Sequence, residues 1–252
     1  MVYVLPKIVW THWDSLENIP ELCVLTIKRN HQILKGWEIK FFTTDDFLQW
    51  CTPPTSFHTL SIQAKTDYMR LWLLKHYGGV WMDCSIVLNV SLDKLYNECL
   101  NNKSELSGFY LEGFTTNIQY PVFESWFIMA PKESRIVELW YEEFVSAMNL
   151  GFAEYKKKVL KEGVDLQNIM FDTYLTIHIC YQVVIQKRVS FAPNVQYKKA
   201  EDTMLSVHDK CKWDGECMKD AFKSPNILNI PYIKLRGGDR ELFPLDYFRD
   251  IL

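Results

Sequence analysis

Hydrophobic and polar positions alternate along the first half of the chain with two different periods. Apolar runs of strand length occupy residues 4–10, 38–43, 108–111 and 126–130. Short runs of this kind, bounded by turn residues, indicate buried strands. Residues 20–36 and 134–149 instead have the three-to-four-residue spacing of amphipathic helices. Strands that alternate with helices predict an α/β fold with a central, mostly parallel sheet flanked by helices.

The second half is more helical and less regular. Residues 152–160 and 173–187 have helical spacing, and the segment RVSFAPNV at residues 188–195 is typical of a strand. In the last fifty residues, short apolar pieces alternate with charged turns. Either a closing flap or a partner-docking tail has this pattern.

The segment QAKTDYMRLWLLKHYGGVWMDCSIVL, residues 63–88, carries the strongest signal for a functional site. Its first part predicts a helix, on which Asp67 and Arg70 are surface neighbours because they are three residues apart. Gly78 and Gly79 follow the last apolar position of the helix, and a glycine there can adopt the left-handed conformation that ends a helix. A carboxylate and a guanidinium are therefore expected on one helix face.

The second part of this segment predicts a buried strand that includes Asp83 and Ser85. In an extended chain, residues two apart point to the same side, so a carboxylate and a hydroxyl would face one point. Hard divalent cations prefer oxygen ligands of this kind. Ligands of parallel α/β sheets bind at the carboxyl ends of the strands, and we expect Asp83 near such an end.

Composition narrows the class of protein. The chain has 252 residues, of which 48% are hydrophobic and 15% aromatic, enough for a single domain with a large core. A net charge of −3 and a pI near 6.1 provide no broad positive field, so nucleic acid is not an expected partner. We also expect no transmembrane segment, because no apolar stretch is long enough to cross a bilayer.

The N-terminal residues and the cysteines favour a cytoplasmic protein. The first ten residues lack the pattern of a signal peptide and are expected to form a strand instead. The seven cysteines are scattered without CxxC spacing, which is typical of a reduced protein. Cys211 and Cys217 are six residues apart, but no second pair completes a zinc site.

Three segments resemble the family-32 glycosyltransferases, especially the capsular polysaccharide synthesis proteins, and more distantly the glucosylating bacterial toxins. These segments are LPKIVWTHWDS, AKTDYMRLWLLKHYGGVWMDCS and FESWFIMAPKESRIVELWYEEF, within residues 5–145. The resemblance implies a nucleotide-sugar-binding glycosyltransferase A-type fold in one domain, 1–252. Residues 1–130 would bind the donor, and residues 131–252 would form the acceptor or closing half.

The resemblance also implies an activity, a cofactor and partners. It implies a retaining hexosyltransferase that uses Mn²⁺ or Mg²⁺, takes a hexose from a uridine- or guanosine-linked nucleoside diphosphate sugar, and builds a glycan. Asp83 matches the first acid of the metal-binding Asp-x-Asp motif. Asp67 and Arg70 match the pair that holds the donor sugar, and Trp10 or Trp13 matches the aromatic residue that stacks on the base.

The chain departs from the family pattern at Ser85, where the motif has its second acid. A neutral ligand lowers the expected metal affinity, and His208 or Asp209 is the candidate for a further metal ligand. Glu124 is the acid expected near the anomeric carbon. Lys234 and Arg236 are cations expected to reach the diphosphate.

Each of these residues also has an ordinary structural interpretation. Asp83 could cap the turn after its strand, Glu124 could simply begin a strand, and His12 and His178 are expected in the core or in loops. Asp67 with Arg70 could form a surface ion pair of little energetic value. For the tryptophans the alternative is a place in the core, and for Lys234 with Arg236 an exposed basic turn.

Two alternatives for the whole protein are also open. One is an inverting transferase or a hydrolase on the same scaffold, with Glu124 as general base. The other is a non-catalytic nucleotide-sugar-binding protein, favoured by Ser85 in place of the second acid.

Overall fold

The structure is a computed structural model that describes residues 3–169 and 173–248. Six strands form the central sheet: β1 Ile8–His12, β2 Glu38–Phe42, β3 Gly79–Met82, β5 Leu106–Tyr110, β6 Phe123–Ala130 and β7 Val195–Lys199. Their order across the sheet is β2-β1-β3-β6-β5-β7. All of them run in one direction except β6, which is antiparallel to both of its neighbours. The predicted α/β class with a mostly parallel sheet is confirmed.

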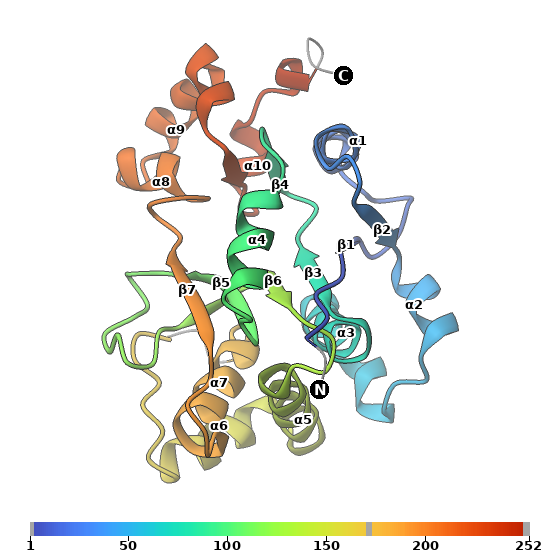
Figure 1. Cartoon of the computed structure of the whole chain (residues 1–252), viewed down its shortest axis with the longest axis vertical. Helices are drawn as coiled ribbons and strands as arrows, with labels where there is room; N and C mark the ends of the chain where they lie inside the picture. Colours follow the sequence, from blue (N-terminus) through green and yellow to red (C-terminus); the bar gives the residue numbers. More distant parts are fainter. Residues whose placement is uncertain (1–2, 170–172, 249–252) are drawn as a thin grey trace.

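Helices surround the sheet, as Figure 1 shows. In chain order they are α1 Glu21–Ile33, α2 Thr44–Trp50, α3 Ile62–Tyr77, α4 Asp93–Asn101, α5 Arg135–Leu150, α6 Phe152–Lys161, α7 Thr176–Val183, α8 Ser206–Lys210, α9 Gly215–Lys223 and α10 Asp239–Leu242. Short irregular helices are η1 Thr55–Thr59, the π-helix η2 Val184–Arg188, η3 Pro225–Asn229 and η4 Leu245–Phe248. None of the helices in the described residues is both long and apolar enough to cross a membrane.

The two faces of the sheet follow the strand period of two. Trp81 of β3 packs in the core beneath α3, α5 and α7. Its neighbours Val80 and Met82 point to the other face, where they pack with Leu95 of α4. Because successive side chains of a strand point to opposite faces, both faces of β3 are buried.

A separate two-stranded ribbon joins distant parts of the chain. β4 Ile86–Leu88 follows β3 closely but pairs antiparallel with β8 Tyr232–Lys234, with Ile86 opposite Lys234. The ribbon packs with α9 and α10 in a third core cluster, which contains Val87, Phe222 and Ile233. In Figure 1 the C-terminal helices α8 to α10 gather with this ribbon at one end of the molecule.

The structure corrects three predictions of local structure. Asp83 to Ser85 form a turn between β3 and β4, closed by the Ile86 N–H donating to the Asp83 carbonyl at 3.0 Å, rather than continuing the strand. The strand predicted at residues 188–195 begins only at Val195. Pro193 and the polar residues before it account for this, since proline interrupts strand pairing.

The third correction concerns the cysteines. Cys211 and Cys217 form a disulfide, whereas Cys23, Cys51, Cys84, Cys99 and Cys180 are free. The expectation that every cysteine is reduced is wrong for this pair. Disulfides are typical of oxidising compartments, so the bond does not favour the cytoplasmic location, which stays a prediction.

Candidate functional site

A cavity of about 630 Å³ opens at the carboxyl ends of β1 and β3. The last residue of β1, His12, lines it together with Trp13, which follows. Asp83, Cys84 and Ser85 of the turn after β3 form its floor, and α3 contributes Arg70. The predicted position of the site, at the carboxyl ends of parallel strands, is therefore where the structure has its open pocket.

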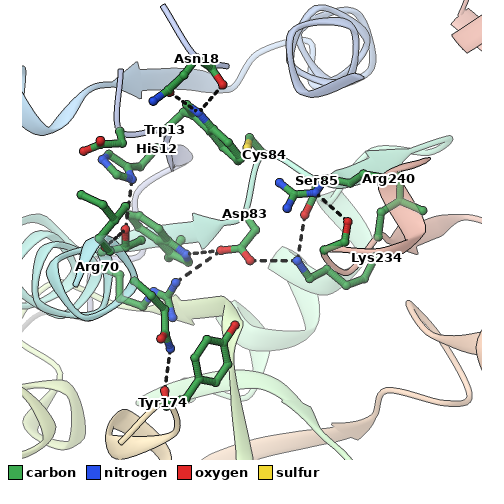
Figure 2. Close-up of a pocket in the computed structure, with 17 residues that line it drawn as sticks. His12, Trp13, Asn18, Arg70, Asp83, Cys84, Ser85, Tyr174, Lys234 and Arg240 are labelled. Carbon is green, nitrogen blue, oxygen red and sulfur yellow. Dashed lines mark hydrogen bonds and ion pairs between the residues drawn. The ribbon is translucent and has the colours of Figure 1, made fainter. Parts of the chain in front are cut away.

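Three donors surround the carboxylate of Asp83, as Figure 2 shows. The Lys234 ammonium donates to Oδ2 at 2.9 Å. The Trp81 indole N–H donates to Oδ1 at 3.0 Å, and the Arg70 guanidinium contacts the same oxygen at 3.5 Å. Burial alone would raise the pKa of Asp83, but Lys234 and Arg70 outweigh it and hold this pKa below its ordinary value. Asp83 is thus an ionised group, and its side chain is partly exposed to the cavity.

Arg70 links Asp83 to a second, deeper acid. Its guanidinium donates to Asp67 at 2.7 Å, and the side chains of both residues are almost wholly buried. Burial raises the pKa of Asp67 to about 6 even though Arg70 opposes the shift. The pair is therefore a buried part of the site and not the surface ion pair of the structural alternative, although Asp67 itself does not line the cavity.

Lys234 contacts both side chains at the predicted Asp-x-Asp position, Asp83 and Ser85. Besides Asp83, its ammonium donates to the Ser85 hydroxyl at 2.9 Å. Lys234 is only 8% exposed, so it is not in an exposed basic turn. The pairing of β8 with β4 brings it here from the far end of the chain.

The two candidate tryptophans lie in different environments. Trp13 lines the main cavity, its indole N–H donates to Asn18, and the Arg240 guanidinium lies 5.2 Å from its ring centre. Trp10 is buried, donates to the Gly78 carbonyl at 2.9 Å, and faces away from this cavity. Trp13 therefore lines the main cavity and stays the predicted base-stacking residue, whereas the buried Trp10 packs in the core.

A second cavity of about 590 Å³ adjoins the first and shares Lys234 and Tyr174 with it. Glu124, at the start of β6, lines the second cavity. Because β6 runs against its neighbours, its first residues lie at the carboxyl ends of the parallel strands. One Glu124 oxygen is 3.8 Å from His178 Nε2, and the other makes no hydrogen bond with a described residue.

His208 and Arg236 form a different cluster from the one predicted. His208 is fully buried, and its Nε2 is 2.8 Å from Asp239. Arg236 binds both oxygens of Asp239 and lies over the Trp213 ring. Burial acts to raise the pKa of Asp239, but its bonds to His208 and Arg236 prevail and lower it. Arg236 still lines the second cavity, whereas His208 lines neither cavity.

The predicted metal centre does not fit these contacts. Asp83 and Ser85 converge on an ammonium, and His208 is engaged by Asp239. Asp209, the alternative ligand, contacts Lys212 instead. Among residues 3–169 and 173–248, no group of three or more His, Cys, Asp or Glu side chains is arranged to hold a metal ion.

Several residues of the site escaped sequence reasoning. Trp81 was detectable in principle, because it precedes Asp83 by two positions in the WMD sequence. Arg240 and Tyr174 carry no local signal, since only the tertiary fold brings them to the cavities. The same holds for the buried His178, which the fold places beside Glu124.

The fold and the site together define an α/β protein with an open, charged ligand pocket at the carboxyl ends of its strands. The chain belongs to the family of capsular polysaccharide synthesis proteins, whose model matches residues 4–235. This match confirms the resemblance to that family found in the sequence.

A curated relative and several solved structures are also similar to the chain. The relative is inositol phosphoceramide mannosyltransferase 1 of Schizosaccharomyces pombe (strain 972 / ATCC 24843), 27% identical over 223 residues. The match covers 84% of this chain and 63% of the relative, so the chain spans less than two thirds of the relative's length.

The structures are similar at low identity. The galactosyltransferase LgtC, solved with donor and acceptor sugar analogues, is 13% identical with a TM-score of 0.48, covering 96% of this chain and 94% of that chain. The PaToxG glycosyltransferase is 12% identical with a TM-score of 0.43, covering 75% and 89% respectively.

Proposed function

We propose that the chain is a glycosyltransferase that moves a hexose from a nucleoside diphosphate sugar to a glycan acceptor, with retention at the anomeric carbon. The family match and the mannosyltransferase relative support sugar transfer. The single observation that carries the proposal is the ionised Asp83, held by Lys234 and Arg70 where two cavities meet. Two adjoining cavities provide one space for a donor and one for an acceptor.

The charges of the site suit the departure of a diphosphate. Cleavage of the sugar–phosphate bond builds positive charge on the anomeric carbon and negative charge on the leaving phosphate. Lys234 and Arg70 are cations that can stabilise the phosphate oxygens, and Asp83 and Glu124 are acids that can stabilise the anomeric carbon. A low-dielectric site strengthens each of these interactions.

The donor would lie along the main cavity. Trp13 provides a ring for stacking on the base, and Arg240 beside it can reach a phosphate. The hexose would then lie near the buried pair of Asp67 and Arg70, with its anomeric carbon toward the boundary at Lys234. The acceptor would enter the second cavity, beside Glu124.

A screen of nucleotide sugars tests the proposal. The purified chain is incubated with UDP-glucose, UDP-galactose or GDP-mannose, and release of the nucleoside diphosphate is measured. We expect turnover of at least one donor, and NMR of the product should show that an α donor gives an α product. A β product would contradict retention and favour Glu124 as a general base for an inverting reaction. Binding of a donor without turnover of any of the three would favour the non-catalytic nucleotide-sugar-binding protein.

One substitution links turnover to the site. Asp83→Asn removes the charge that organises Lys234 and Arg70, so we expect turnover to fall by about 10²- to 10³-fold with the fold intact. The matched control is Asp220→Asn, which changes an exposed acid of α9 outside both cavities. Circular dichroism checks the fold of each variant.

A further inference from the structure

The Lys234 ammonium occupies the point where the family's motif would place a metal ion. Its Nζ is 2.9 Å from Asp83 Oδ2 and 2.9 Å from Ser85 Oγ, the two side-chain oxygens of the Asp-x-Asp position. The ammonium is therefore held between the Asp83 carboxylate and the Ser85 hydroxyl. Of its three N–H donors, these contacts use two, so one remains for an oxygen of a ligand.

The surrounding charges oppose a divalent cation at this point. Mg²⁺ demands near-octahedral oxygen ligands at about 2.0–2.1 Å, whereas both available oxygens already accept hydrogen bonds from Lys234. The Arg70 guanidinium stands against the other oxygen of Asp83 at 3.5 Å. Two positive groups at this distance repel a divalent ion strongly in a partly buried site.

The replacement of the motif's second acid by Ser85 is consistent with an ammonium in this place. Asp83 and Asp67 together carry two negative charges, and Lys234 and Arg70 carry two positive charges. A second acid at position 85 would leave this group with a net negative charge facing a diphosphate. The serine hydroxyl instead fixes the ammonium by a hydrogen bond and keeps the group neutral.

We propose that Lys234 takes the place of the divalent metal, and that this protein binds and releases the diphosphate without a metal ion. The inference rests on the proposed function and deepens it. Lys234 donates to a phosphate oxygen of the donor, and Asp83 and Ser85 hold the ammonium in position. When the bond between the anomeric carbon and the phosphate oxygen breaks, its electron pair stays on the phosphate, whose growing negative charge the ammonium stabilises. The acceptor hydroxyl oxygen forms the new bond to the anomeric carbon, and its proton passes to the departing phosphate.

Chelation and metal binding test this inference by separate measurements. Turnover of the accepted donor is measured in EDTA and in MnCl₂, and the affinity for UDP and GDP is measured by calorimetry in both media. We expect the wild-type protein to retain its turnover and its nucleotide affinity in EDTA. Loss of turnover in EDTA with recovery in Mn²⁺ would overturn the inference.

Two lysine variants distinguish the specific role of the Lys234 ammonium from the general effect of removing one positive charge. Lys234→Met should lower turnover by about 10²- to 10³-fold, and nucleotide affinity by at least about tenfold. Lys35→Met, an exposed lysine outside both cavities, should change neither. Equal behaviour of the two variants would contradict the assignment. If Lys234→Met does not fold, the chelation experiment on the wild-type protein still decides.

A Mn²⁺ titration measures metal binding at the site independently of turnover. Electron paramagnetic resonance should show no micromolar Mn²⁺ binding to the wild-type protein. The double variant Ser85→Asp with Lys234→Ala restores two acids and removes the ammonium, so it should bind Mn²⁺. Micromolar Mn²⁺ binding by the wild-type protein would refute the inference, even if no donor were found. If no donor is turned over and Mn²⁺ does not bind, only the proposed function is refuted.

Discussion

The carboxylates of Asp67 and Asp83 are joined by one guanidinium, but their pKa values are shifted in opposite directions. Lys234 and Arg70 keep Asp83 ionised, whereas burial raises the pKa of Asp67 to about 6. The number of strong donors near each carboxylate accounts for the difference. Asp83 accepts from Arg70, Trp81 and Lys234, whereas Arg70 is the side chain that donates to Asp67 among the described residues.

This difference predicts an acid limb in the pH profile. As pH falls through about 6, Asp67 takes up a proton and Arg70 loses the nearer of its two charged partners, so we expect turnover to fall as well. His12 does not share this limb, because its burial lowers its pKa to about 4. In Asp67→Asn the limb near pH 6 should disappear, and in Asp220→Asn it should remain. A limb that persists in Asp67→Asn would assign it to another group.

At the residue scale, the sequence predicted which side chains lie together where the signal is local, and the roles given to these side chains stay predictions. Asp67, Arg70, Asp83 and Ser85 lie within nineteen positions, and their spacing places them together. Lys234 was expected at the diphosphate, but its contact with Asp83 spans 151 positions and depends on strand pairing that the sequence does not reveal. His208 failed as a metal ligand because its partner, Asp239, is set by packing of α8 against the C-terminal segment.

At the scale of elements, the junction between α3 and β3 positions the whole site. Gly78 and Gly79 both have positive φ, and a Cβ on Gly79 would lie 2.4 Å from Ile8 Cγ2 and 2.7 Å from the Ile8 carbonyl oxygen. The start of β3 therefore packs directly on β1, and the strand that follows leads to Asp83 at the cavity.

We accordingly expect Gly79→Ala to be strongly destabilising. Steric overlap and a left-handed backbone together should lower the free energy of unfolding by about 3 kcal/mol. Gly36→Ala is the control, because Gly36 also has positive φ but open space around it, and it should cost only about 1–2 kcal/mol. Urea denaturation measures both. Similar losses for the two variants would show that the overlap is relieved elsewhere.

The elements of the first half follow from hydrophobic periodicity, and the exceptions have physical causes. β2, α1, α3 and α5 lie close to the predicted ranges, whereas β1 begins four residues after the start predicted for it. Periodicity cannot distinguish a strand from a tight turn of three residues, which is why Asp83 to Ser85 were assigned to a strand. Periodicity also does not indicate the direction of a strand within the sheet, so the antiparallel β6 was not predicted.

At the scale of the whole molecule, two cavities share one wall. Lys234 and Tyr174 line both cavities, and the C-terminal elements close the second one with Trp213 and Arg236. The predicted division at residue 130 does not separate the cavities, because the main cavity takes residues from both halves of the chain. A single domain with both halves contributing to donor binding is the arrangement that we propose.

The disulfide near the second cavity leads to a stability prediction. Cys211 and Cys217 flank Trp213, so the bond closes a short loop that carries a cavity residue. Reduction should lower the free energy of unfolding by about 2 kcal/mol, or Tm by roughly 5 °C. Thermal melts with and without a reducing agent measure this, and the Cys211→Ser, Cys217→Ser double variant should be insensitive to the reducing agent. Seven reactive thiols in the denatured, unreduced protein would disprove the bond.

The pairing of β4 with β8 limits which insertions and deletions before β8 the site can tolerate. Ile86 lies opposite Lys234, and side chains along a strand alternate sides, so slipping β8 by one position would turn the ammonium away from Asp83 and present a neighbouring apolar side chain. Deletions or insertions in the preceding η3 region are therefore tolerable only if they leave this alignment unchanged. A change of length in that segment is compatible with the site only when β8 keeps its present register with β4, because a shift of one residue would remove the ammonium from Asp83.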